Sequence, residues 1–369
     1  MMQLSARPVE IMPFFTKPFL ARCCIEHAGM ILLACLALSC GGREATPTPT
    51  FKDMFEGPRP TILQVPAEIE ANLNGFPHLT QSGYFFINHE VQRVYGFNFE
   101  GMLHFTAGAK GNGPGEFVMP NAVATDAFGR VFVSDLFTAR VQAFLPRGEF
   151  FKTFTLGTAC YGLATSSRND KNYLRVVSSG ACDNQRCMIS EFDIEDASKM
   201  VYGQYGQEAE YANWTLTQDA DFCSYLVDMG GQTVHVYSPD GEIIDTIDLG
   251  LSPSWRGVDW DSMPRNSAAN PKQRGEKLKT LPHTLVSGIY WDSDCLFVVL
   301  VRRNFSKSEP AIILDTFTAE GRLLKAGLVL ETMPVGIQNG HAYFYDNLTA
   351  DGHTTHTITS YRVVPPRRD

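Results

Sequence analysis

No apolar run in this chain is long enough to cross a membrane as a helix. The longest, between Ala28 and Cys40, holds about a dozen residues, whereas a spanning helix needs roughly 20. A run of this length behind the basic residues Lys17 and Arg22 is typical of an export signal. We therefore expect residues 1–39 to be a signal peptide and the rest of the chain to lie outside the cytoplasm.

Positive charge is also scarce. The chain carries 31 Lys and Arg against 40 Asp and Glu, which gives a formal net charge of −9. Because contacts with phosphates need a basic surface, this balance argues against a nucleic-acid partner. The 44% of hydrophobic residues is typical instead of a globular body with a large core.

Common catalytic motifs are missing as well. The sequence has no nucleophile elbow, no HExxH zinc motif and no paired-carboxylate pattern. The sequence therefore favours a protein without enzymatic activity, and it identifies no catalytic residues.

The end of the apolar run carries a short motif. Ala37-Leu38-Ser39-Cys40, followed by two glycines, resembles the lipobox of bacterial lipoproteins. The resemblance implies acylation of Cys40, which would hold the chain on a membrane of the cell envelope, facing the periplasm or the exterior. Cys35, with Leu32 three residues before it, is the second choice, and an ordinary secretory signal is the alternative. We expect residues 40–59 to be the lipidated cysteine and a flexible Pro- and Thr-rich tether.

The remaining chain, residues 60–369, repeats itself. Gly83 to Gly101 and Gly129 to Gly148 share, in order, a glycine, an alternating apolar strand, Asn or Asp, Arg-Val, an aromatic residue and a second glycine. The second glycines lie 47 residues apart (148 − 101), and further copies extend the pattern to six units. Several short strands in each unit of this length are typical of a β-propeller. We expect an all-β, six-bladed β-propeller of four-stranded antiparallel blades, with a monomeric body.

A glycine-rich motif separates the first two units. It reads Gly111-Asn-Gly-Pro-Gly-Glu-Phe117, with Pro120 after it. Together with the strand and Asp135 that follow, it resembles the NHL repeats of bacterial six-bladed propeller lipoproteins. That resemblance implies the fold and an extracytoplasmic location but no single activity, because such folds host binders and enzymes. The motif fits no phosphate-binding pattern, so we interpret it as a tight crossover between blades.

Ligands of propellers usually bind at the mouth of the central channel, which is surrounded by loops of one face. The innermost strand of each blade starts on this face. The residues that we expect to ring the mouth, read from the start of each innermost strand, are His78, Asn121, Tyr161, Trp214, His283 and Val335.

Five of the nine histidines map to one sector of this face. Imidazole is a common ligand of transition metals. One hypothesis is a divalent-metal site built from His78, His283 and one of His89, His353 or His356. The other is that these are scattered loop histidines and that the protein needs no cofactor.

An insertion at about 251–281 interrupts the period between the fourth and fifth units and should cross the mouth face. It contains Trp255, Arg256 and Trp260, and aromatic residues with Arg are common in binding hot spots. The insertion is either a lid over a ligand or partner, or a passive cap.

An exported protein can form disulfides. Cys182 and Cys187 flank one loop of the third unit and are the first choice for a bridge, with Cys160 on the same face. Cys223 and Cys295 lie at the opposite face and are expected to stay free.

These features favour a membrane-anchored binding module for a peptide, glycan or partner protein, acting through the mouth face. The alternative is a metal-assisted hydrolase or lyase with a histidine-lined site. An enzyme should bring several titratable groups together in the channel, whereas a binding module should expose an aromatic and basic surface.

Overall fold

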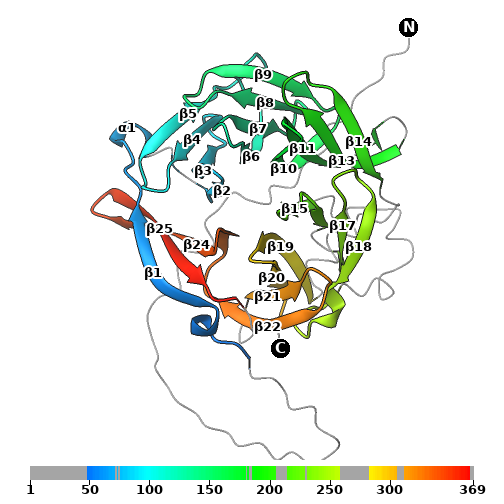
Figure 1. Ribbon diagram of the computed structural model, residues 1–369. Helices are drawn as coiled ribbons and strands as arrows, with labels where there is room; N and C mark the ends of the chain where they lie inside the picture. The colour runs from blue at the N-terminus through cyan, green and yellow to red at the C-terminus, as the bar shows by residue number, and fades with distance from the viewer. Residues whose placement is uncertain are drawn as a thin grey trace, which may run out of the picture. The chain divides into compact units, whose positions relative to one another are not determined.

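The computed structural model describes residues 48–365 apart from 71–72, 74, 180, 183–184, 205–213, 229–230, 258–281 and 306–310. The described chain forms six antiparallel sheets that are arranged as blades around a ring (Figure 1). Five of the described sheets have four strands, and the third has four long strands and a fifth, two-residue strand. The predicted six-bladed, all-β propeller is therefore confirmed.

The blades follow one another in chain order, and the innermost strand comes first in each. Blade 1 consists of β2 (His78–Thr80), β3 (Gly83–Asn88), β4 (Arg93–Phe97) and β5 (Leu103–Ala107). Blade 2 consists of β6 (Pro120–Thr125), β7 (Val131–Asp135), β8 (Arg140–Phe144) and β9 (Phe150–Thr155). Blade 3 consists of β10 (Ala159–Arg168), β11 (Lys171–Ser179), β13 (Gln185–Asp193) and β14 (Lys199–Gln204), with the short β12 (Ala181–Cys182) paired to β13.

The second half of the ring repeats this order. Blade 4 consists of β15 (Trp214–Gln218), β16 (Ser224–Asp228), β17 (Thr233–Tyr237) and β18 (Ile243–Asp248), followed by the 3-10 helix η2 (Leu249–Leu251). Blade 5 consists of β19 (His283–Asp292), β20 (Cys295–Arg303), β21 (Ile312–Thr318) and β22 (Leu323–Leu330). Blade 6 takes β23 (Pro334–Gln338), β24 (His341–Ala350) and β25 (His353–Val363) from the C-terminal part of the chain.

The fourth strand of blade 6 comes from the other end of the chain. The 3-10 helix η1 (Phe51–Asp53) leads into β1 (Phe55–Ile62), which pairs with β25 from Phe55↔Val363 to Ile62↔Thr357. The short helix α1 (Ala67–Glu70) then leads toward blade 1. Pairing between the two ends of the body closes the ring.

This closure corrects the expected tether, which we had extended to residue 59. The expectation was wrong for residues 51–59 because β1 is an edge strand and most of its side chains are exposed, so it shows little apolar periodicity. Pro58 lies at a register shift between Glu56 and Arg59, and bulges and edge strands are where proline is tolerated in sheets.

Apolar side chains fill the spaces between neighbouring blades. Phe85 and Ile87 of blade 1, for example, share one buried cluster with Phe117, Val123 and Val133 at blade 2. Similar clusters join blades 2 and 3, blades 4 and 5, blades 5 and 6, and blades 6 and 1. The core is therefore distributed around the ring.

The glycine motif forms the crossover from β5 to β6, as we interpreted it. Gly115 has φ +78°, a conformation that side chains with a Cβ rarely adopt. The carboxylate of Asp135 accepts hydrogen bonds from the backbone N–H groups of Val118 and Met119, both at 2.9 Å. Arg140 donates to two carbonyls of the motif, at 2.6 and 2.8 Å. Side chains of blade 2 thus hold the crossover in place.

Candidate functional site at the channel mouth

The six innermost strands begin at the same face of the ring, and the residues predicted at the mouth lie at these starts. His78, Trp214 and His283 are first in β2, β15 and β19, Asn121 and Val335 are second in β6 and β23, and Tyr161 is third in β10. His78, Asn121 and Tyr161 are half-buried, and His283 is buried. The side chain of Trp214 lies outside the described part.

Neighbouring innermost strands are linked at the mouth. The side-chain amide of Asn121 in blade 2 donates to the carbonyl of Cys160 in blade 3, at 3.4 Å. His78 lies near His89, which is exposed in the turn between β3 and β4. Burial, with a smaller contribution from His89, lowers the pKa of His78 from 6.5 to about 4. His78 is therefore neutral at physiological pH.

The five histidines of the metal-site hypothesis lie in different surroundings. Among the residues that the structure describes, which include all five, no three side chains of His, Cys, Asp or Glu are grouped closely enough to share a metal ion. His353 lies near the exposed tip of the β24–β25 hairpin, which is longer than the repeat predicted. His356 instead turns into the space between blades 6 and 1, where its Nδ1 lies 2.7 Å from the hydroxyl of Tyr345.

The start of the predicted insertion is firmly attached to blade 5. Asp315 on β21 is buried and accepts hydrogen bonds from the hydroxyls of Ser252 and Ser254, the second at 2.9 Å. Burial raises the pKa of Asp315, and these hydrogen bonds oppose the rise. Trp255 packs against the core between blades 4 and 5. Trp260 and the rest of the insertion up to residue 281 lie outside the described residues.

Arg256 belongs to a cluster of arginines around one aromatic ring. Its backbone exchanges hydrogen bonds with Thr284 of β19, at 2.8 and 3.1 Å. Its guanidinium lies over the ring of Phe305, 5.6 Å from the centroid, and that of Arg302 lies 5.1 Å from the same centroid. We call Arg256, Arg302 and Phe305 the blade 5 cluster.

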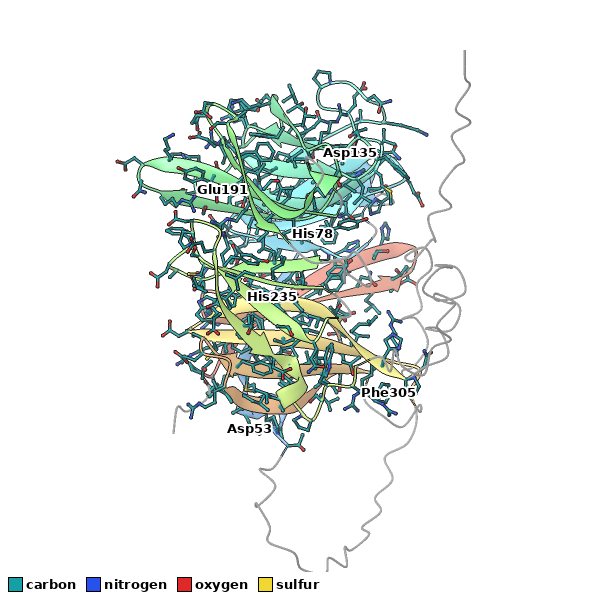
Figure 2. All side chains as sticks on the ribbon, turned by 90° about the vertical axis from the view of Figure 1, so that its right-hand side faces the viewer. Asp53, His78, Asp135, Glu191, His235 and Phe305 are labelled. Atoms are coloured by element: carbon teal, nitrogen blue, oxygen red, sulfur yellow. The ribbon has the colours of Figure 1, made fainter. Side chains whose placement is uncertain are left out.

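Sequence reasoning found only Arg256 of this cluster. Arg302, Arg303 and Phe305 stand at the end of β20 and just after it, where every blade turns at the mouth face. The end of the second strand of the fifth unit would therefore have indicated these three residues. The repeat is weak in that unit, so the end of this strand could not be placed from the sequence. Figure 2 shows Phe305 on the same side of the ring as Asp135, at the end of β7, and Glu191 toward the other side.

Large apolar side chains are exposed on mouth loops of other blades. Phe76 lies 47% exposed before β2, Phe137 57% exposed after β7, and Leu348 68% exposed on the β24–β25 hairpin. This hairpin projects from the ring on the same side as Phe305 (Figure 2). The mouth face therefore combines apolar and basic groups that are accessible to a ligand.

The described cysteines are all free thiols. Cys160, Cys223 and Cys295 form no disulfide, as expected for the last two. Burial raises the pKa of Cys160 to about 12, so its thiol is a poor nucleophile. The side chains of Cys182 and Cys187 lie outside the described part, and their bridge stays a prediction.

Comparisons with known proteins bear on the fold. No family model matches the sequence, and no curated protein matches it. The chain is similar to a DUF4221 family member from Bacteroides vulgatus, with a TM-score of 0.57 and 10% identity over 84% of this chain and 98% of that chain. It is similar to a Bacteroides fragilis protein whose name marks it as a candidate for export, with a TM-score of 0.56 and 10% identity over 84% and 96%.

A streptogramin B lyase structure is also similar, with a TM-score of 0.43 and 12% identity over 84% and 98% of the two chains. At these identities the first two likenesses show the propeller fold, and the third is too distant to carry an argument. Within the described residues, no helix combines the length and the apolar character that crossing a membrane requires.

Proposed function

We propose that this protein is a binding module of the cell envelope, which holds a peptide, glycan or partner protein through the mouth face of its propeller. The observation that carries the proposal is the exposed surface of that face. Arg256, Phe137 and Leu348 come from different blades and are all accessible there. Exposed apolar groups gathered on loops of a rigid scaffold are typical of interaction sites.

Two exposed phenylalanines of blade 2 offer a matched test. Phe137 follows β7 at the mouth, and Phe128, which is 64% exposed, precedes β7 at the opposite face. A photo-crosslinking residue placed at 137 in the cell-expressed full chain should capture a defined product, and the same residue at 128 should not. Equal capture from both positions, or capture from 128 alone, would contradict the proposal.

The anchor is tested separately. Cys40→Ala should abolish labelling by an alkyne fatty acid and release the protein from membranes, whereas Cys35→Ala should change neither. Labelling that depends on Cys35 would move the anchor, and a parent protein without label would remove the lipid from the proposal.

A further inference from the structure

We infer that the blade 5 cluster is a subsite for a carboxylate-bearing peptide, such as a segment rich in Glu or Asp. The inference rests on the proposed function and assigns it a ligand chemistry. Its starting point is the convergence of two guanidinium groups, those of Arg256 and Arg302, on one phenyl ring.

The cluster is held in place before any ligand arrives. The backbone of Arg256 is paired with Thr284, and Thr284 lies opposite Arg302 in the register of β19 and β20. The strand β19 thus lies between the segments that carry the two arginines and holds both in register. The hydrogen bonds from Ser252 and Ser254 to the buried Asp315 anchor the loop that carries Arg256. A site whose groups are already ordered loses less conformational entropy when it binds.

The charges of the cluster favour an anion. Within the described part of the chain, Arg256 forms no ion pair with a carboxylate. The guanidinium of Arg256 is exposed, so its N–H donors are accessible to a carboxylate of a ligand.

The geometry favours a peptide over a glycan. Sugar rings bind to aromatic residues by stacking on an open ring face, and guanidinium groups already lie over the ring of Phe305. The same guanidinium groups present planar pairs of N–H donors, which suit the two oxygens of a carboxylate. The phenyl ring therefore orients the arginines, and the arginines contact the ligand.

The test uses a fluorescent peptide of alternating Glu and Ala and the full chain purified in detergent. The Glu peptide should bind, and its affinity should fall as salt is added. Its Gln counterpart should bind at least about tenfold more weakly, the loss expected for a charge-assisted contact. Arg256→Gln should lower the affinity for the Glu peptide by about tenfold. Phe305→Leu should also lower this affinity, because both arginines would lose the ring that orients them. Arg147→Gln, an exposed arginine in the turn between β8 and β9, is the control and should have no effect.

Three results would overturn the inference: equal affinity for the Glu and Gln peptides, an affinity that Arg256→Gln leaves unchanged, or tighter binding of an oligogalacturonate than of the Glu peptide. Inorganic phosphate as a competitor separates a peptide carboxylate site from a general anion site, and full competition at low millimolar phosphate would also overturn it. If the parent protein does not bind the Glu peptide but position 137 still captures a crosslinked product, this inference is refuted and the proposed function stands. Thermal unfolding of each variant verifies its fold.

Discussion

Between blades 1 and 2 the space is filled by apolar side chains, among them Phe85, Phe105 and Phe117, all buried. Between blades 3 and 4 the described apolar cluster is small and lies beside a buried ion pair. There Arg175 donates from Nε to Glu191 at 2.8 Å, and both side chains are almost completely buried. The same ring geometry is thus stabilised by two different chemistries.

The ion pair is joined to the next blade by directional bonds. Arg175 also donates to the carbonyl of Phe222 at 2.9 Å and to the hydroxyl of Ser224, both in blade 4. Arg168 pairs with the other oxygen of Glu191 and donates to the carbonyl of Pro239 at 2.9 Å. Apolar contacts tolerate small shifts, whereas these bonds require one relative position of the two blades. The repeat is eroded in sequence where the packing chemistry changes, although the strand arrangement is kept.

The largest expected effect comes from breaking the ion pair. Glu191→Gln removes the carboxylate charge that faces the buried Arg175, and we expect a loss of about 3–5 kcal/mol in the free energy of unfolding. Urea unfolding followed by fluorescence measures this loss. The control is Glu195→Gln, because Glu195 pairs with Arg130 but its side chain is 62% exposed, and such pairs contribute about 1 kcal/mol or less. Similar losses in both variants would show that the buried pair contributes no more to the free energy of unfolding than the exposed pair does.

The apolar interface should respond almost as strongly. Phe85→Ala should lower the free energy of unfolding by about 3–4 kcal/mol, because it removes a fully buried ring and leaves a cavity. Phe128→Ala, at an exposed ring, should cost less than about 0.5 kcal/mol. A small loss at Phe85 would mean that the interface relaxes around the deleted ring.

The same contrast explains how much of the fold could be predicted from the sequence. Alternating strands and glycines at fixed spacing indicate blades, and those signals survive where packing is apolar, as around Phe85. The edge strand β1 was missed because pairing with β25 is made by backbone groups, which leave little trace in side-chain pattern. Strand starts such as His78 and His283 were predictable, since they follow from blade register alone.

The candidate site was less predictable, since it depends on contacts between segments distant in sequence. Arg256 and Phe305 are brought together by the pairing of Arg256 with Thr284 and of Thr284 with Arg302. The positions of the histidines were hard to predict for a related reason: the β24–β25 hairpin is longer than the repeat predicts and carries His353 near its tip, and His356 points into the space between blades 6 and 1. Register gives the face of a residue but not the direction of its side chain.

Loss of the crossover brace should have an intermediate effect. Asp135→Ala removes the acceptor of the Val118 and Met119 amides, and we expect a loss of about 2 kcal/mol. Hydrogen exchange should accelerate at those two amides before it does in β7. Asp346→Ala is the control, because among the hydrogen bonds between described residues the exposed Asp346 accepts a single, local one, from the next residue, Asn347. Unchanged protection of Val118 and Met119 would show that the glycine motif holds its shape without blade 2.

The smallest effect should come from acid, through His78 in blade 1. Its pKa is lowered to about 4 in the folded protein against 6.5 in the unfolded chain, so the unfolded chain binds the proton more readily. The contribution of the neutral imidazole is fully present above pH 6.5 and is lost as the pH falls toward 4. Because His78 is half-buried and partly screened by solvent, we expect the loss between pH 7 and pH 5 to be about 1–2 kcal/mol. Urea unfolding at both pH values should show a smaller pH dependence in His78→Gln than in the parent protein, and His353→Gln, at the exposed hairpin tip, should behave like the parent. An identical pH dependence in all three proteins would mean that water reaches His78 freely in the folded ring.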